Sequence, residues 1–390
     1  MKSNLIIIVL FFCALVGVNY PVITGVSWAD LFVVPLFIYV ILNLKSIKIN
    51  NDIIAYTSII YAIIMLISAL INATITDTIF LNFFRNYIEG CIAYLALKRA
   101  INNERDFKIF SYIAILYCVL YIFMISRSFS TIIGGGGKFS SLNSEIYGGR
   151  NGMAVTNLLL IILLSYIVYF WRTTKSYIVF LLFPFLIFNI IFSASRFSVI
   201  SLALFVLFFV IFMTKEIKTI HKMGLIIIII AIPFFVEHLT SNMDVDAMMY
   251  SSELLNDKIT QNEDGGFMYR LNNLNYKVIV NWLDNTPVYK WILGDGISIT
   301  HGVFAFTFCC TGIVGFFYFL VSHIKMIILV WKKSLIGKYL AFFIFIFFLN
   351  DIVTNSRFII GLNTLIYMGM LALMSNTIVL KIQERRKWTQ

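Results

Sequence analysis

Long apolar runs separated by short polar connections make up most of this chain. About 20 apolar residues span a bilayer as a helix, and a backbone in lipid must satisfy its own hydrogen bonds, so each run predicts a transmembrane helix. Twelve runs are present, with cores at roughly 5–20, 29–44, 53–71, 79–97, 107–126, 152–171, 177–193, 197–213, 223–237, 303–330, 338–353 and 358–379. The pattern predicts an all-α fold in which residues 1–390 form a single, polytopic integral membrane domain.

One long polar stretch, at residues 237–302, interrupts this pattern. Within it, apolar side chains recur at spacings of three and four from Phe267 to Trp282, which predicts an amphipathic helix. Its opposite face carries Arg270, Asn273, Lys277 and Asn281. Such a helix can lie along a membrane surface. We expect 237–302 to form a large outer loop, with short amphipathic helices, that covers a site built from helix ends.

Composition supports a membrane protein, and the distribution of charge predicts its topology. Hydrophobic residues make up 60% of the chain and charged residues 13%, which excludes a soluble globular protein. The net charge of +11 comes largely from basic clusters in alternate connections, such as those at Lys45, Arg99 and Lys215. The positive-inside rule places these connections and both termini in the cytoplasm. The charge therefore indicates membrane lipids as partners, not nucleic acid, and the 237–302 loop faces outward.

Two ionisable residues lie within the fourth apolar run, where they are costly and usually face a cavity or a partner. Arg85 and Glu89 are four residues apart and share one helical face. They are either a pair that neutralises itself at helical spacing or part of a polar cavity.

The sequence predicts neither a cofactor nor a metal site. The five cysteines are odd in number and all lie in apolar runs, which does not indicate a disulfide framework. No spacing among the cysteines and the four histidines is typical of a metal site. Asp244 and Asp246 resemble the acidic pair of metal-dependent nucleotide-sugar enzymes, but in an outer loop a solvated turn is the simpler interpretation.

The candidate site comes from the starts of the helices that run inward from the outer face. In this topology the sixth, eighth, tenth and twelfth helices do so, and each is preceded by a basic or proton-carrying residue. These residues are Arg150 with Asn151, Arg196, His301 and Arg357. A cation at a helix N-terminus opposes the helix dipole by roughly 0.3–1 kcal/mol, so an anion among them explains the placements better. Phosphate suits both helix N-termini and the arginine fork, although any one arginine can instead be a headgroup anchor.

Several short motifs then resemble a known family, the bacterial O-antigen polymerases and O-antigen ligases. The motifs occur in the same order as in the family, and the pattern of hydrophobic runs is similar along the whole chain. The motifs are Ser193-Ala194-Ser195-Arg196, Tyr269-Arg270, Gly294-Asp295-Gly296 followed by His301, Thr311-Gly312-Ile313-Val314-Gly315-Phe316, and Asn350-Asp351 before Arg357. In the ligases an asparagine commonly follows the histidine, whereas Gly302 follows it here.

The resemblance implies a location in the bacterial inner membrane, with 237–302 as a periplasmic loop, and a role for each residue. Arg196 and Arg270 would contact the pyrophosphate of an undecaprenyl-pyrophosphate-linked glycan. His301 would act near the sugar hydroxyl, or is simply a satisfied interfacial histidine, and Asp351 would support the site. It also implies a chain-length regulator and a flippase as partners. The chemistry fits, because fixed arginines can neutralise a departing pyrophosphate without a metal.

The sequence therefore predicts an O-antigen polymerase, a glycosyltransferase that joins lipid-linked repeat units in lipopolysaccharide biosynthesis. Two alternatives stay open. An O-antigen ligase would transfer the glycan to the lipid A core instead. A twelve-helix transporter belongs to a different class, and no repeat of one half of the chain in the other is visible beyond Ser-Arg-Phe at 195–197 and 356–358.

Overall fold

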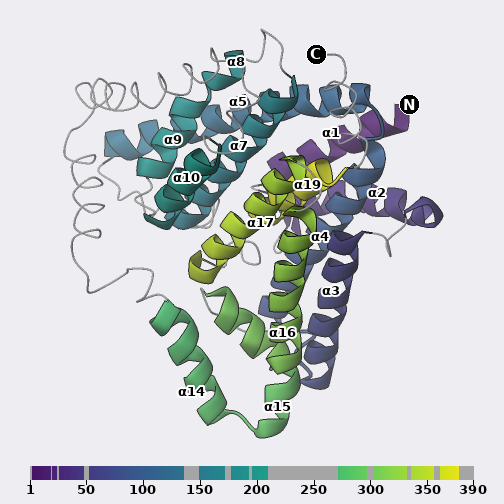
Figure 1. Cartoon of the computed structure of the whole chain (residues 1–390), viewed down its shortest axis with the longest axis vertical. Coiled ribbons are helices and arrows are strands. Elements are labelled where there is room, and N and C mark those ends of the chain that lie inside the picture. The colour runs from purple at the N-terminus through teal and green to yellow at the C-terminus, as the bar shows by residue number, and fades with distance from the viewer. Residues whose placement is uncertain are drawn as a thin grey trace. The chain divides into compact units, whose positions relative to one another are not determined.

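A computed structural model describes this protein as a bundle of α-helices with one short β-hairpin (Figure 1). The described residues are 2–18, 20–23, 26–47, 52–135, 149–171, 177–192, 196–209, 271–296, 302–331, 335–354 and 361–376. They divide into two compact units, residues 1–109 with 265–390 (unit 1) and residues 110–264 (unit 2).

Most described elements belong to unit 1. They are α1 (Lys2–Gly17), β1 (Pro21–Ile23), β2 (Val26–Ser27), α2 (Trp28–Leu42), η1 (Leu44–Ser46), α3 (Ile53–Ile71), α4 (Thr78–Ala100), the π-helical turn η5 (Asn272–Tyr276), α14 (Lys277–Asn285), α15 (Val288–Leu293), α16 (Val303–Trp331), α17 (Leu335–Thr354) and α19 (Gly361–Met374). The long helix α5 (Glu104–Gly135) begins in unit 1 and continues in unit 2.

Unit 2 is centred on α7 (Gly149–Trp171), which packs against α9 (Phe183–Phe192) and α10 (Arg196–Phe208). Asn189 of α9 donates a hydrogen bond of 3.2 Å to Asn157 of α7, and both side chains are buried. Such polar contacts hold helices together in an apolar environment. The run predicted at 177–193 forms two helices, α8 (Tyr177–Phe180) and α9, with a turn between them ahead of Pro184.

Four helices among the described residues are long and apolar enough to cross a membrane, which is consistent with a membrane protein. They are Ile53–Ile71, Glu104–Ile125, Gly152–Tyr169 and Val303–Trp331. The first has the bounds that the hydropathy pattern predicts. Further apolar helices of 10–17 residues, including Trp28–Leu42 and Gly361–Met374, accompany them. The predicted run at 223–237 lies outside the described residues.

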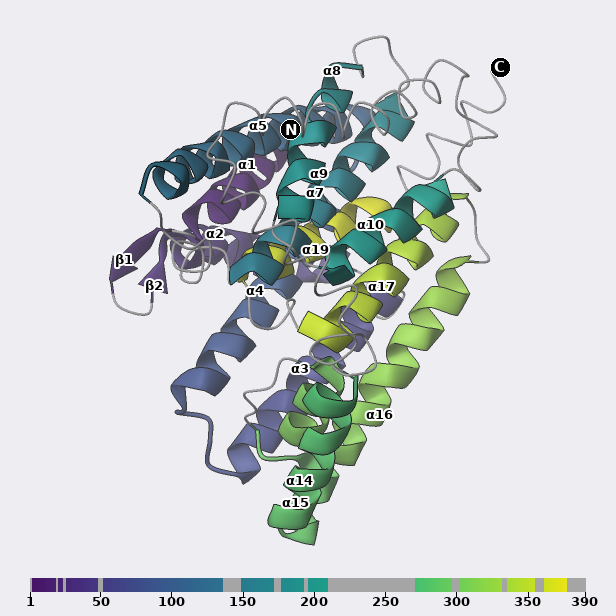
Figure 2. The same ribbon diagram turned by 90° about the vertical axis from the view of Figure 1, so that its left-hand side faces the viewer.

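Helix α4 lies at the centre of unit 1 and packs against α1, α2, α3 and α19 (Figures 1 and 2). Small residues allow the closest approach, between α4 and α19. A Cβ atom at Gly90 would lie 2.7 Å from Thr364 Cγ2 and 3.0 Å from Met368 Cγ. Both Ala93 and Ala96, one and two turns further along α4, are fully buried. Close backbone packing between small residues is the usual way in which membrane helices associate.

One end of unit 1, here called the Asp52 end, is closed by polar side chains from α3, α4 and the residues after α19. Lys98 Nζ lies 2.5 Å from Asp52 Oδ2, and the Tyr94 hydroxyl donates to the same carboxylate. Asn376 donates a hydrogen bond of 2.5 Å to the Ile101 carbonyl. The start of α3 thus meets the ends of α4 and α19, which is the alternation of direction that the charge pattern predicts.

Helix α16 is broken at Gly312. The φ of 63° and ψ of −164° at this residue are not helical and suit glycine. The Phe304 and Phe316 rings are 5.8 Å apart, whereas a separation of twelve positions would span about 18 Å of straight helix. The piece at 303–311 therefore folds back towards the piece at 313–331. The prediction of one continuous helix at 303–330 is wrong in this respect, because hydropathy does not reveal a change of direction.

Candidate functional site

The buried side chain of Asn275 joins three segments that are far apart in the sequence. Asn275 lies in η5 and is 2% exposed. Its Nδ2 donates to the Ile352 carbonyl of α17 at 2.9 Å. Its Oδ1 accepts hydrogen bonds from the backbone N–H groups of Phe304 and Ala305, at 3.1 and 3.2 Å. The amide thus satisfies N–H groups that the first turn of α16 leaves without a partner inside the helix, in the manner of an N-cap.

Gly302 provides the space for this amide. A Cβ atom at this position would lie 2.2 Å from Asn275 Oδ1 and 2.5 Å from its Nδ2, closer than any side chain permits. The difference from the ligase pattern, in which an asparagine follows the histidine, therefore has a structural reason. In this chain the position after His301 must be small because Asn275 of another segment places its amide there.

The two starting turns of α16 and α19 both lie against the first half of α4. The rings of Phe83 in α4 and Phe306 in α16 pack edge to face, 5.1 Å apart. A Cβ atom at Gly361, the first residue of α19, would lie 3.0 Å from Asn86 Oδ1. Together with Asn275 and Ile352, these contacts gather the starts of two helices and the end of a third around α4. We call this region the Asn275 junction.

The structure describes only part of the predicted set of site residues. Asp351 is fully buried in the last turn of α17, directly before the Ile352 carbonyl that Asn275 binds. The backbones of three others lie within helices, Arg150 and Asn151 in α7 and Arg196 at the start of α10, but their side chains are outside the described part. The remaining three, Arg270, His301 and Arg357, lie outside the described residues.

The acidic and basic residues within α4 make contacts to another helix. Arg85 Nε lies 3.4 Å from Asp30 Oδ1 in the first turn of α2. The Asp30 carboxylate also accepts from the Ser27 N–H at 2.5 Å and from the Ser27 hydroxyl at 2.9 Å. Glu89 is 8% exposed and shares a side-chain hydrogen bond with Asp30. Arg85 and Glu89 therefore belong to a polar cluster between α4 and α2, an arrangement that differs from both a pair confined to one helix and a polar cavity.

A second polar cluster holds the break in α16. The backbone N–H groups of Asp295 and Gly296 donate to the Cys309 and Cys310 carbonyls at 2.7 and 2.9 Å. These carbonyls end a helical piece, so they need partners from outside it. Gly294, with φ of 75°, must be glycine because a Cβ atom would lie 2.4 Å from the Cys310 backbone.

The Asp295 carboxylate in turn ties α14 and α15 to this break. It accepts from Trp282 Nε1 at 2.5 Å and lies 2.7 Å from Lys290 Nζ. The hydrogen bond with Asp295 raises the pKa of Lys290. The Gly294-Asp295-Gly296 and Thr311-Gly312 motifs, which the sequence presents separately, therefore form one structural unit.

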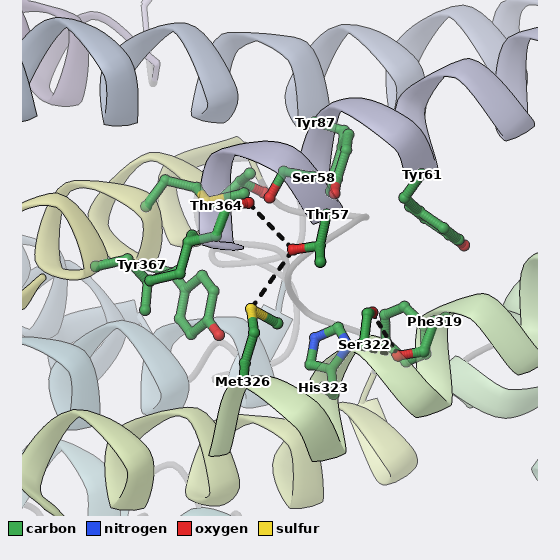
Figure 3. Close-up of a pocket in the computed structure, with 13 residues that line it drawn as sticks. Thr57, Ser58, Tyr61, Tyr87, Phe319, Ser322, His323, Met326, Thr364 and Tyr367 are labelled. Carbon is green, nitrogen blue, oxygen red and sulfur yellow. Dashed lines mark hydrogen bonds between the residues drawn. The ribbon is translucent and has the colours of Figure 1, made fainter. Parts of the chain in front are cut away.

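A cavity that the sequence does not predict lies between α3, α4, α16 and α19 (Figure 3). The space between its walls, including the part open to the surroundings, amounts to about 520 Å³. Its polar lining includes Thr57, Ser58, Tyr61, Ser322, His323 and Thr364. His323 Nδ1 lies 2.8 Å from the Phe319 carbonyl of its own helix, and Thr57 contacts Met326 Sδ at 3.5 Å. Asp351, the predicted site residue whose side chain the structure describes, does not line this cavity.

Two features of the sequence indicate this cavity. Thr57 and Ser58 place hydroxyl groups in α3, and His323 lies inside an apolar run. Serine and threonine in apolar helices commonly bond their own backbone, and Thr57 does donate to the Ile53 carbonyl at 2.7 Å. The same side chain also lines the cavity.

No cluster of three or more histidine, cysteine, aspartate or glutamate residues that could hold a metal occurs in the part of the chain that the structure describes. Asp244 and Asp246 lie outside that part. No protein-family model, curated protein or solved structure matches the chain.

Proposed function

We propose that the chain is an O-antigen polymerase of the bacterial inner membrane. It would carry twelve transmembrane helices, both termini in the cytoplasm and the 237–302 loop in the periplasm. The four membrane-length helices and the alternation of helix directions around α4 support such a topology. In this orientation the Asp52 end is cytoplasmic and carries Lys98, as the positive-inside rule requires.

The single observation that carries the proposal is the Asn275 junction. Asn275 follows Arg270 by five residues, Phe304 follows His301 by three, and Ile352 follows Asp351 directly. One buried amide bonds the segments next to three residues that the family resemblance assigns to one site. This arrangement supports a common site for Arg270, His301 and Asp351 at the outer end of α16.

The proposed reaction transfers a growing glycan from one undecaprenyl pyrophosphate to the hydroxyl of a lipid-linked repeat unit. The hydroxyl oxygen attacks the anomeric carbon of the donor, and its proton passes to His301. The bond from that carbon to the pyrophosphate oxygen breaks, with the electron pair leaving on the oxygen. Arg270 and Arg357 stabilise the departing charge through paired hydrogen bonds, and Asp351 supports the site.

A deletion strain complemented with variants tests this proposal. Loss of a polymerase leaves lipopolysaccharide capped with single repeat units, whereas loss of a ligase leaves no repeat attached. We expect Arg196→Ala, Arg270→Ala and Arg357→Ala to abolish chain elongation while the protein still accumulates in the membrane. The matched control is Lys277→Ala, which removes an exposed charge from α14. Near-normal glycan ladders from all three arginine variants would contradict the proposal.

One observation favours the transporter as a second candidate. The break at Gly312 gives unit 1 a discontinuous helix, and secondary transporters commonly build their binding sites from such helices. A purified protein that exchanges a substrate across liposomes without lengthening any glycan would favour this alternative.

A further inference from the structure

Helices α14 and α15 are consecutive but expose opposite kinds of surface. The exposed side chains of α14 are mostly polar and include Lys277, Asn281, Asp284 and Asn285. In α15 the exposed side chains are apolar, with Val288 67%, Tyr289 65% and Ile292 55% exposed. A solvated surface helix carries its polar residues on the exposed face, as α14 does and α15 does not.

The apolar surface of α15 continues onto the elements against which it packs. Helix α15 contacts α3 and α16. At the end of α3, Leu70 and Ile71 are 54% and 59% exposed. In α16, just after the break, Val314 is 45% and Phe317 55% exposed.

The exposed apolar residues of α16 extend much further. Val314, Phe317, Val321, Ile324 and Ile328 are all exposed and recur at spacings of three and four, so they form one stripe along the helix. The piece at 313–331 belongs to an apolar segment of membrane-spanning length, and we take this stripe as its lipid-facing side. The surface of α15 is therefore continuous with a surface that meets lipid.

We propose that α15 is embedded in the acyl chains of the bilayer, while the polar face of the adjoining α14 meets water and lipid headgroups. The segment taken as an outer loop would then enter the membrane at α15. This inference rests on the exposed surfaces and does not depend on glycosyl transfer.

The charges of α15 agree with this placement. Lys290 is the one charged residue within its six positions, and its ammonium lies 2.7 Å from the Asp295 carboxylate. Pairing offsets much of the cost of bringing a charge near lipid. Tyr289, Trp282 and Trp291 surround the region, and tyrosine and tryptophan are enriched where membrane meets water.

Nitroxide labels on the full chain test the proposal. Tyr289→Cys and the matched control Asn281→Cys would be labelled and reconstituted in vesicles of phosphatidylethanolamine and phosphatidylglycerol. Collisions with oxygen, which concentrates in acyl chains, and with a water-soluble nickel chelate would then be measured. Unsubstituted protein, carried through the same labelling, corrects for the native cysteines.

We expect the ratio of oxygen to nickel collisions to be several-fold higher at position 289 than at position 281. Equal ratios at both positions, with strong nickel collisions, would place α15 in water and overturn the proposal. Protection of position 289 from both reagents would also overturn it, because a second copy or another protein would then cover the surface.

Discussion

The Asp52 end and the Asn275 junction both join helices of unit 1, but through different kinds of polar contact. Each ties three segments of unit 1 together. The Asp52 end uses an ion pair, with Lys98 26% and Asp52 13% exposed, whereas the junction uses one neutral amide that is 2% exposed. A carboxylate at the junction would bring a charge into a buried position, which is costly. A neutral amide holds the same backbone groups without that cost.

The largest expected effect comes from Asn275→Ala. It removes three hydrogen bonds worth about 1 kcal/mol each and leaves buried backbone groups unpaired, so we expect a loss of about 3 kcal/mol and of chain elongation. Unfolding in mixed micelles titrated with sodium dodecyl sulfate measures the loss of stability. Glycan ladders measure the loss of chain elongation. The matched control Asn272→Ala, at an exposed position of the same turn, should change neither. Normal chain elongation by the Asn275→Ala variant would show that the Asn275 junction is not needed for activity.

A second substitution tests the same junction by crowding it. Gly302→Asn places a Cβ atom 2.2 Å from Asn275 Oδ1, and such overpacking costs about 1–3 kcal/mol. Combined with Asn275→Gly, which vacates the space, it should cost less than the sum of the two single changes. Strict additivity in this double-mutant cycle would show that the two residues do not compete for the same volume.

At the Asp52 end, Lys98→Met should affect stability without affecting chemistry. It removes a charged hydrogen bond of 2.5 Å to Asp52, and such a bond contributes about 1.5 kcal/mol. We expect a loss of this size in the same micelle titration, with an unchanged glycan ladder once expression is matched. Shortened glycans at equal protein levels would show that the Asp52 end, like the Asn275 junction, is needed for chain elongation.

The smallest effect concerns Lys290, whose ammonium lies 2.7 Å from the Asp295 carboxylate. We expect Lys290→Met to cost about 0.5 kcal/mol in the same micelle titration, because partly exposed ion pairs contribute little. An unchanged free energy of unfolding would show that the ion pair does not contribute.

Hydropathy predicts the helices of unit 1 well because helix length and lipid exposure are encoded locally. The predicted bounds of α3 agree with the structure, and the alternating directions of α3, α4 and α19 agree with the charge pattern. The break in α16 is not predictable in this way, since Gly312 differs from other glycines only through its contacts with Ile292 and Gly294.

The candidate site is predictable to a smaller extent. Asp351 is fully buried in the last turn of α17, and its predicted role in supporting the site stays a prediction. Asn275 was missed although it lies four residues after Leu271 and three before Val278, and so on the apolar face, where a buried polar side chain needs a hydrogen-bond partner. The roles of Arg196, Arg270, His301 and Arg357 stay predictions, because their side chains lie outside the described part of the chain.

Reconstituted glycan synthesis tests the central claim most directly. The purified full chain would be placed in vesicles with undecaprenyl-pyrophosphate-linked repeat units, and glycan length and released undecaprenyl pyrophosphate would be measured together. We predict one pyrophosphate carrier released for each linkage formed by the native protein, and neither product from His301→Ala or Arg270→Ala. Absence of elongation by the native protein, or full elongation by both variants, would contradict the account.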